Sequence, residues 1–198
     1  MPATANADGR VVWITGLSGA GKSTLAQEVV RRLREDAFAP ILLDGDEIRA
    51  VLGGASASGS QHTREARLAL GMTYARLAQV LALQGHVVVV ATISMFREIH
   101  EWNRENLPGY LEVYLRVPVD ERRRRDPKCI YERYDRGELA HVAGLDIPVD
   151  EPQQPHMVLT GSSMHETWRA SQSIVLAITR QESSCKPNGI TRHWPMPT

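Results

Sequence analysis

The stretch from Val11 to Ser23 reads VVWITGLSGAGKS, and it decides the fold. Its first five residues are mostly β-branched, which is typical of a short strand. Residues 16–23 fit the pattern G-x-x-x-x-G-K-[ST]. The residues after them carry an apolar stripe at helical spacing, formed by Leu25, Ala26, Val29, Val30 and Leu33. A strand, a glycine-rich loop and a helix in this order are the context in which the pattern binds phosphate groups.

The glycine-rich loop predicts a site for ATP and Mg²⁺. Glycines let successive backbone N–H groups turn inward around phosphate oxygens, and the N-terminus of the following helix adds positive potential. Lys22 is expected to reach the β- and γ-phosphates as a catalytic point charge, and Ser23 to ligate Mg²⁺. The pattern alone still allows a kinase, a GTPase, a motor or a regulatory ATPase. The residues predicted to hold the nucleotide are Gly16, Ser18, Gly19, Ala20, Gly21, Lys22, Ser23 and Thr24.

The composition argues against several other classes of protein. The 198 residues include 23 basic and 23 acidic side chains, and this zero net charge argues against a nucleic-acid partner. No apolar run approaches the length of about 18 residues that a membrane span needs, and the first ten residues lack the features of a signal peptide. Two cysteines are too few for a disulfide framework. We expect a cytoplasmic protein that acts on a small molecule, with no membrane or nucleic-acid partner.

Strands and helices alternate along the rest of the chain. Further strands are predicted at residues 41–43, 87–93, 110–116 and 156–159, and helices at 47–52, 64–84, 96–106, from 118, and at 164–180. The segment VVVVATI at 87–93 is apolar almost throughout, as in a parallel sheet covered on both faces. The order predicts an α/β fold, a three-layer α/β/α kinase-type sandwich around a five-stranded parallel sheet. We expect one domain over residues 1–181, with a lid at about 120–150, and a flexible tail at 182–198.

Two carboxylates follow the second predicted strand, and they favour a kinase among the phosphate-loop proteins. The chain lacks the N-K-x-D pattern of GTPases, the LSGGQ-like signature of transporter ATPases and an Asp-Glu pair after an apolar strand. Of the two candidate catalytic residues, Asp44 and Asp46, one can accept the proton of an acceptor hydroxyl or orient its oxygen. The second of these carboxylates can help to hold Mg²⁺. The candidate Mg²⁺ ligands are Ser23 and Asp46. Arg49 is suited to clamp an anionic acceptor. The alternative interpretation is a polar turn that only caps the next helix.

Five separate segments resemble the adenylylsulfate kinase family. They are residues 16–24 (GLSGAGKST), 43–46 (LDGD) with Arg49, 93–94 (IS), 112–114 (EVY) and 125–128 (RDPK) with Tyr131. The resemblance covers about residues 11–160, and it implies transfer of the γ-phosphate of MgATP to the 3′-hydroxyl of adenylylsulfate. It further implies a five-stranded parallel sheet, a mobile lid and a homodimer.

The resemblance also implies roles for individual side chains. It supports Asp44 and Asp46 as catalytic residues, places Arg49 and Arg64 against the charged group of the acceptor, and places Arg125 in the lid near ATP as a further catalytic residue. The run 122–124 that precedes it is expected to be a solvated helix face. The residues that complete the predicted acceptor site are Arg67, Ile93, Ser94 and Phe96.

The sequence departs from the family where the acceptor's base would bind. Family members have one Phe in the loop after D-G-D and another in the lid. Here residues 53–62 contain no Phe, Tyr or Trp, Val142 stands at the lid position, and Arg67 replaces an Asn. Stacking on an aromatic side chain is worth about 1–3 kcal/mol per base, so the loss of both partners indicates a rebuilt acceptor side. In this respect the chain is similar to the cytidine diphosphoramidate kinases.

The sequence leaves several acceptors open. Adenylylsulfate and a cytidine diphosphoramidate-like nucleotide fit the anionic acceptor side equally well. A kinase for a non-nucleotide metabolite or an amine is one alternative, and a non-catalytic nucleotide-sensing module is another.

Overall fold

The computed structural model of the chain describes residues 9–52, 63–161 and 163–180. Its centre is a five-stranded sheet in the order β2-β3-β1-β4-β5, and all the strand pairs are parallel. The predicted strands are confirmed with boundaries that differ by one or two residues. They are β1 (Arg10–Gly16), β2 (Ile41–Asp44), β3 (Val87–Thr92), β4 (Leu111–Leu115) and β5 (Met157–Leu159).

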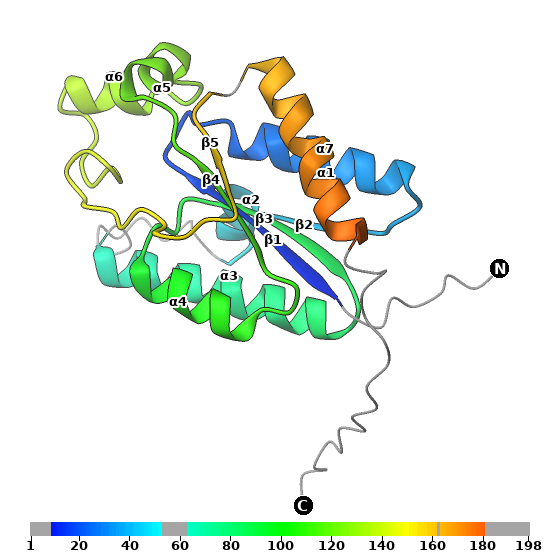
Figure 1. Ribbon diagram of the computed structural model, residues 1–198. Coiled ribbons are helices and arrows are strands. Elements are labelled where there is room, and N and C mark those ends of the chain that lie inside the picture. Colours follow the sequence, from blue (N-terminus) through cyan, green and yellow to red (C-terminus); the bar gives the residue numbers. More distant parts are fainter. Residues whose placement is uncertain (1–8, 53–62, 162, 181–198) are drawn as a thin grey trace, which may run out of the picture.

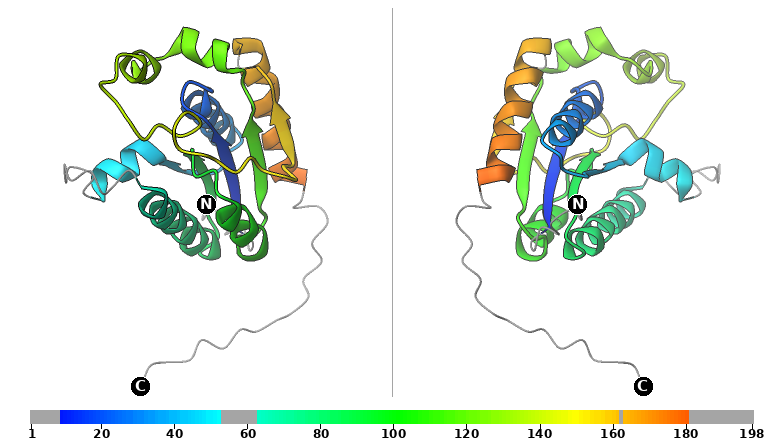
Figure 2. Two further views of the ribbon diagram at one scale, coloured as in Figure 1. Left: turned by 90° about the vertical axis from the view of Figure 1, so that its left-hand side faces the viewer. Right: turned by 90° about the vertical axis from the view of Figure 1, so that its right-hand side faces the viewer.

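Helices cover both faces of this sheet, which confirms the three-layer prediction. One face is covered by α1 and α7 and the other by α3 and α4, while α2 extends beyond the β2 edge (Figures 1 and 2). The helices are α1 (Lys22–Glu35), α2 (Gly45–Val51), α3 (Arg64–Leu83), α4 (Arg97–Asn106), α5 (Val119–Arg125), α6 (Ile130–Asp135) and α7 (Met164–Arg180). The sequence did not predict α6, which lies inside the segment interpreted as lid or long loop. Along the described parts of the chain, no helix is both long and apolar enough to cross a lipid bilayer.

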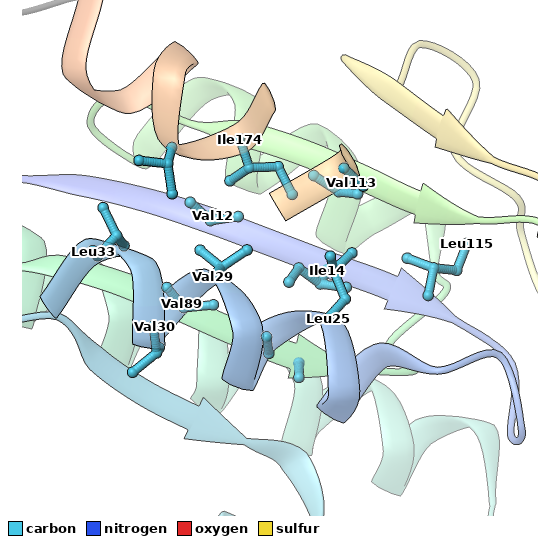
Figure 3. Close-up of a cluster of buried hydrophobic side chains, with 14 of the residues drawn as sticks. Val12, Ile14, Leu25, Val29, Val30, Leu33, Val89, Val113, Leu115 and Ile174 are labelled. Atoms are coloured by element: carbon cyan, nitrogen blue, oxygen red, sulfur yellow. The ribbon is translucent and has the colours of Figure 1, made fainter. Parts of the chain in front are cut away.

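The core is divided by the sheet into two clusters of side chains. Because side chains alternate between the faces of a strand, Val12 and Ile14 of β1 pack against α1 and α7 (Figure 3), whereas Val11 and Trp13 pack on the α3 and α4 side. All four side chains are fully buried. Central strand β1 is therefore held from both sides, and the loop that follows it starts from a rigid base.

The carboxyl ends of the parallel strands meet at one edge of the sheet, and this edge positions the candidate site. In open α/β sheets, ligands bind beyond that edge. The loop after β1, the acidic end of β2 and the end of β3 all lie there. The predicted lid region reaches the same edge, because the hydroxyl of Tyr131 in α6 donates a hydrogen bond to the carbonyl of Ser18, 2.9 Å away. The single-domain boundary at 181 stays a prediction, and residues 182–198 lie outside the described part of the chain.

Candidate active site

The loop between β1 and α1 forms a tight turn that fits a phosphate group. Its turn is closed by a hydrogen bond from the N–H of Ala20 to the carbonyl of Leu17 at 3.2 Å. Gly19 and Gly21 have φ angles of 77° and 94°, a region in which side chains are strained. A Cβ on Gly19 would also lie 2.9 Å from the carbonyl oxygen of Arg122. These glycines therefore permit both the turn and its close contact with α5.

Lys22 begins α1 and reaches back across this loop. Its ammonium group donates a hydrogen bond to the carbonyl of Leu17 at 2.9 Å. Burial is the largest influence on this group and lowers the pKa of Lys22 to about 8, with Lys128 adding to the effect and Asp46 opposing it. A charge held in a buried place without full compensation favours the arrival of an anion, as the phosphate groups of ATP would supply.

Asp44 is a buried carboxylate that joins the phosphate loop to α2. Its Oδ2 accepts a hydrogen bond from the Ser23 hydroxyl at 2.6 Å, and its Oδ1 accepts one from the N–H of Asp46 at 3.0 Å. The second bond makes Asp44 the N-cap of α2. Asp44 therefore does cap the next helix, as the alternative interpretation of the sequence has it. The same side chain also lies beside Ser23. The structure thus brings Asp44, rather than Asp46, next to the other predicted Mg²⁺ ligand.

Asp46 is more exposed and faces the loop between α5 and α6. Its carboxylate accepts a hydrogen bond from the ammonium group of Lys128. Burial would raise the pKa of Asp46, but Lys128, Arg49 and Lys22 outweigh it and hold that pKa below its ordinary value. Asp46 is therefore an ionised carboxylate, which suits a group that orients or deprotonates a hydroxyl. Lys128 was outside the predicted site residues, although its RDPK motif was a signal that could have included it.

The arginine run of α5 divides into buried and exposed members. The prediction of a solvated face is wrong for Arg122, which is 7% exposed, donates to the carbonyl of Val117 at 3.0 Å and also donates to the hydroxyl of Tyr131. It holds for Arg123, which pairs with the exposed Asp135, and for Arg124, which is itself exposed and pairs with Glu121. Arg122 and Tyr131 together join α5 and α6 to the phosphate loop.

A cleft of about 750 Å³ joins these groups, and it contains most of the predicted site. Arg125 lines it and is paired with Glu121. Gly16 and Ala20 are absent from its lining and belong to the buried base of the loop. The predicted residues that line the cleft are Ser18, Gly19, Gly21, Lys22, Ser23, Thr24, Asp44, Asp46, Arg49, Arg67, Ile93 and Arg125.

Three predicted acceptor residues lie behind the cleft wall and do not line it. Phe96 is 5% exposed and packs in the core on the α3 and α4 side. Arg64 lies over its ring, 5.2 Å from the ring centre, and donates to the carboxylate of Glu98 at 2.9 Å. The hydroxyl of Ser94 is buried and lies 2.9 Å from that of Thr92. The structure thus places these side chains in the packing and ion pairs that support α4.

Arg49 of α2 and Arg67 of α3 also line the cleft and lie near each other. Burial and the nearby charge of Arg49 lower the pKa of Arg67. The guanidinium of Arg67 donates to the carbonyl of His141 at 2.5 Å and so ties α3 to the loop beyond α6. Two neighbouring guanidinium groups that repel each other in a cleft create positive potential that attracts an anion.

Comparison with known proteins identifies the family to which this fold and site belong. A model of the family described as adenylylsulphate kinase matches residues 8–160. The chain belongs to this family. An adenylyl-sulfate kinase of Paraburkholderia xenovorans is 38% identical over 159 residues, which cover 80% of this chain and 87% of that protein. A cytidine diphosphoramidate kinase of Campylobacter jejuni is 37% identical over 143 residues, 72% of this chain and 81% of that protein.

The solved structures agree with the family assignment. An APS kinase of Mycobacterium tuberculosis, in complex with AMPPNP and APS, superposes with a TM-score of 0.77 at 31% identity. The match covers 87% of this chain and 98% of that one. Together with the intact phosphate loop and the paired carboxylates, the family membership makes this chain an ATP-dependent phosphotransferase.

Proposed function

We propose that this kinase transfers the γ-phosphate of MgATP to a ribose hydroxyl of an anionic pyrimidine nucleotide, of the type represented by cytidine diphosphoramidate. The observation that carries the proposal is the acceptor wall of the cleft. It presents Arg49 and Arg67 and, among the described residues, no Phe, Tyr or Trp side chain. Residues 53–62 of the sequence contain none either. A purine gains more than a pyrimidine from two flanking aromatic rings, so their absence weakens a purine acceptor more.

The residues present fit a nucleotide with its magnesium ion. The Ser23 hydroxyl and the Asp44 carboxylate lie 2.6 Å apart at the loop, and hard oxygen donors of this kind suit Mg²⁺. When bound, Mg²⁺ neutralises negative charge on the phosphates. Backbone N–H groups of the loop and the N-terminus of α1 hold the phosphates. Lys22 adds a point charge, carried on a side chain that is slim enough to fit inside the loop.

The acceptor hydroxyl is activated and oriented by a carboxylate at the end of β2. Asp46 is the group we assign to this step, because it is ionised and half-exposed in the cleft, while Asp44 is committed to Ser23 and to capping α2. Lys128 pairs with Asp46 and is placed to turn toward phosphate oxygens when the nucleotide occupies the cleft. The lid helices exclude water, so that transfer to the acceptor is favoured over hydrolysis.

Adenylylsulfate is the second candidate acceptor. The family match and the superposition on an APS kinase favour it. A non-nucleotide metabolite or an amine is disfavoured by the nucleotide-type acceptors in the names of the relatives. The intact Lys22, Ser23, Asp44 and Asp46 disfavour a sensing module. The homodimer and the cytoplasmic location stay predictions.

An acceptor screen tests the proposal. Purified protein with MgATP is offered cytidine diphosphoramidate, adenylylsulfate and simple phosphorylated metabolites, and ADP release and ³²P transfer are followed. We expect the cytidine nucleotide to have the highest kcat/KM. A Lys22→Ala variant is the control for adventitious ATPase activity. Equal or better turnover of adenylylsulfate would contradict the pyrimidine assignment, and ADP release no faster than the control with every acceptor would contradict a kinase.

A further inference from the structure

One residue with an aromatic side chain does line the cleft, and no sequence pattern singled it out. Among the described residues that line the cleft, His141 is the sole one with an aromatic side chain. His141 is exposed, whereas the next two residues, Val142 and Ala143, are 7% and 8% exposed. Val142, which stands where the family has its lid aromatic, is thus buried in the loop and presents little surface to a ligand.

The backbone of His141 is held in a strained conformation. Its φ angle of 62° lies in the left-handed region, which few residues other than glycine adopt without cost. Asp146 fixes this turn from one side, because its carboxylate accepts hydrogen bonds from the N–H groups of His141 at 2.6 Å and Val142 at 2.5 Å. These bonds hold the pKa of Asp146 below its ordinary value, although burial opposes them.

Arg67 fixes the same turn from the other side. It bonds the carbonyl of His141, and it is also one of the two guanidinium groups that face the acceptor. Strained conformations persist where the surrounding structure over-determines them, and they concentrate at ligand-binding sites. Here two charged side chains, one in the same loop and one in α3, fix the backbone of a residue that lines the cleft.

We propose that the imidazole of His141 is the platform on which the base of the acceptor nucleotide lies, with Asp146 and Arg67 as its positioning residues. The inference rests on the proposed function, since it requires an acceptor that has a base. A single small ring matches a pyrimidine in size, and stacking on a π-face tolerates different bases. The platform would thus serve in place of the two aromatic residues that the family uses.

Two variants at position 141 distinguish the effect of the imidazole ring from the effect of the backbone turn. His141→Asn removes the ring and keeps a residue that tolerates the left-handed region, so the loop stays folded. His141→Phe restores a ring. Glu138→Gln is the matched control, because Glu138 is an exposed carboxylate of the same lid whose ion pairs are long, at 3.9 and 4.0 Å.

The kinetic assay compares acceptors with and without a base, using cytidine diphosphoramidate, adenylylsulfate and ribose 5-diphosphate. For the nucleotide acceptors, we expect H141N to raise the acceptor KM roughly 10- to 100-fold. The KM for ATP should stay within about twofold, and H141F should recover most of the loss. For ribose 5-diphosphate, H141N should have no effect. Asp146→Ala should raise the acceptor KM as H141N does, while Glu138→Gln should not.

Two results overturn the inference, and they differ in what they say about the proposed function. If a nucleotide is phosphorylated and H141N leaves its KM unchanged, or raises the KM of the base-lacking acceptor equally, the platform is wrong and the kinase assignment stands. If only base-lacking acceptors are phosphorylated, both the platform and the nucleotide acceptor are wrong.

Discussion

The partly buried, desolvated position of Lys22 predicts that ATP binding weakens as the pH rises above neutrality. In the nucleotide-free protein the pKa of Lys22 is about 8, mainly because of burial. The charged fraction of this ammonium is therefore about 0.9 at pH 7, about 0.5 at pH 8 and about 0.1 at pH 9. Phosphates of ATP stabilise the charged form, so the apparent Kd for ATP should rise about tenfold between pH 7 and pH 9. A lysine with an ordinary pKa would leave that Kd nearly constant over this range.

The same linkage gives a second, independent readout. Because binding restores the proton on Lys22, each ATP bound at pH 8 should take up about half a proton. Titration calorimetry in two buffers with different ionisation enthalpies measures this uptake directly. The secondary ionisation of phosphate, near 6, is complete at this pH and does not interfere. The protein should carry serine at both cysteines, so that no thiol contributes.

The stability of the nucleotide-free protein should change in the opposite direction. Burial depresses the pKa of Lys22 in the folded state, so this group lowers the free energy of unfolding at neutral pH. That penalty is removed as the pH rises from 8 toward the ordinary pKa of lysine. A Lys22→Ala variant should bind ATP weakly with a Kd that does not vary with pH. A wild-type Kd that is flat from pH 7 to pH 9, with no proton uptake, would refute the reasoning.

Three further predictions concern the lid and the stability of the fold. Tyr131→Phe removes the hydroxyl that donates to the phosphate loop and accepts from Arg122. At roughly 1 kcal/mol for the bond to the loop, the KM for ATP should rise about fivefold. Tyr134→Phe in the same helix is the control, and an equal rise in that variant would contradict the prediction. Lys128→Met should raise the pKa of Asp46, because it removes a positive charge beside that carboxylate. The acid limb of the plot of kcat/KM against pH should therefore move to higher pH. An acid limb at the same pH as in the wild type would count against Asp46 as the base. Ala37 lies just after the C-terminus of α1 with a φ of 63°, a conformation that glycine adopts without strain. Ala37→Gly should therefore raise the free energy of unfolding by about 0.5–1 kcal/mol. Urea denaturation measures this free energy, and a lower value for the variant would contradict the prediction.

The fold and the ATP side of the cleft could be predicted because their signals are local. The strand, loop and helix from β1 to α1 form one continuous stretch, and the apolar strand β3 needed no partner to be recognised. Element boundaries moved by only one or two residues. Reasoning from local sequence led to the wrong prediction for Arg122, because a run of four arginines indicates a solvated helix face. Its burial depends on Val117 and on Tyr131 of another helix.

The residues of the proposed acceptor side could be predicted less completely. In that part of the chain, residues that are adjacent in sequence point to different places in the structure. Ile93 lines the cleft, while Ser94 and Phe96, only one and three residues later, turn into the packing that supports α4. His141 enters the site through a backbone angle and through a hydrogen bond from Arg67, which is 74 residues away. Neither feature has a signature in the sequence.

This difference between the two sides suggests how a kinase of this family can change its acceptor without losing its chemistry. The ATP side is built from two compact motifs, at residues 16–24 and 44–46, which begin at the carboxyl ends of β1 and β2. The proposed acceptor side is lined by residues of α2, α3, the end of β3 and the loop at 139–143. Substitutions at Arg67 or His141 alter that wall while the bond between Ser23 and Asp44 stays in place. Phosphoryl transfer and acceptor choice can therefore vary separately, which is why variants at His141 should change the acceptor KM and leave the KM for ATP nearly unchanged.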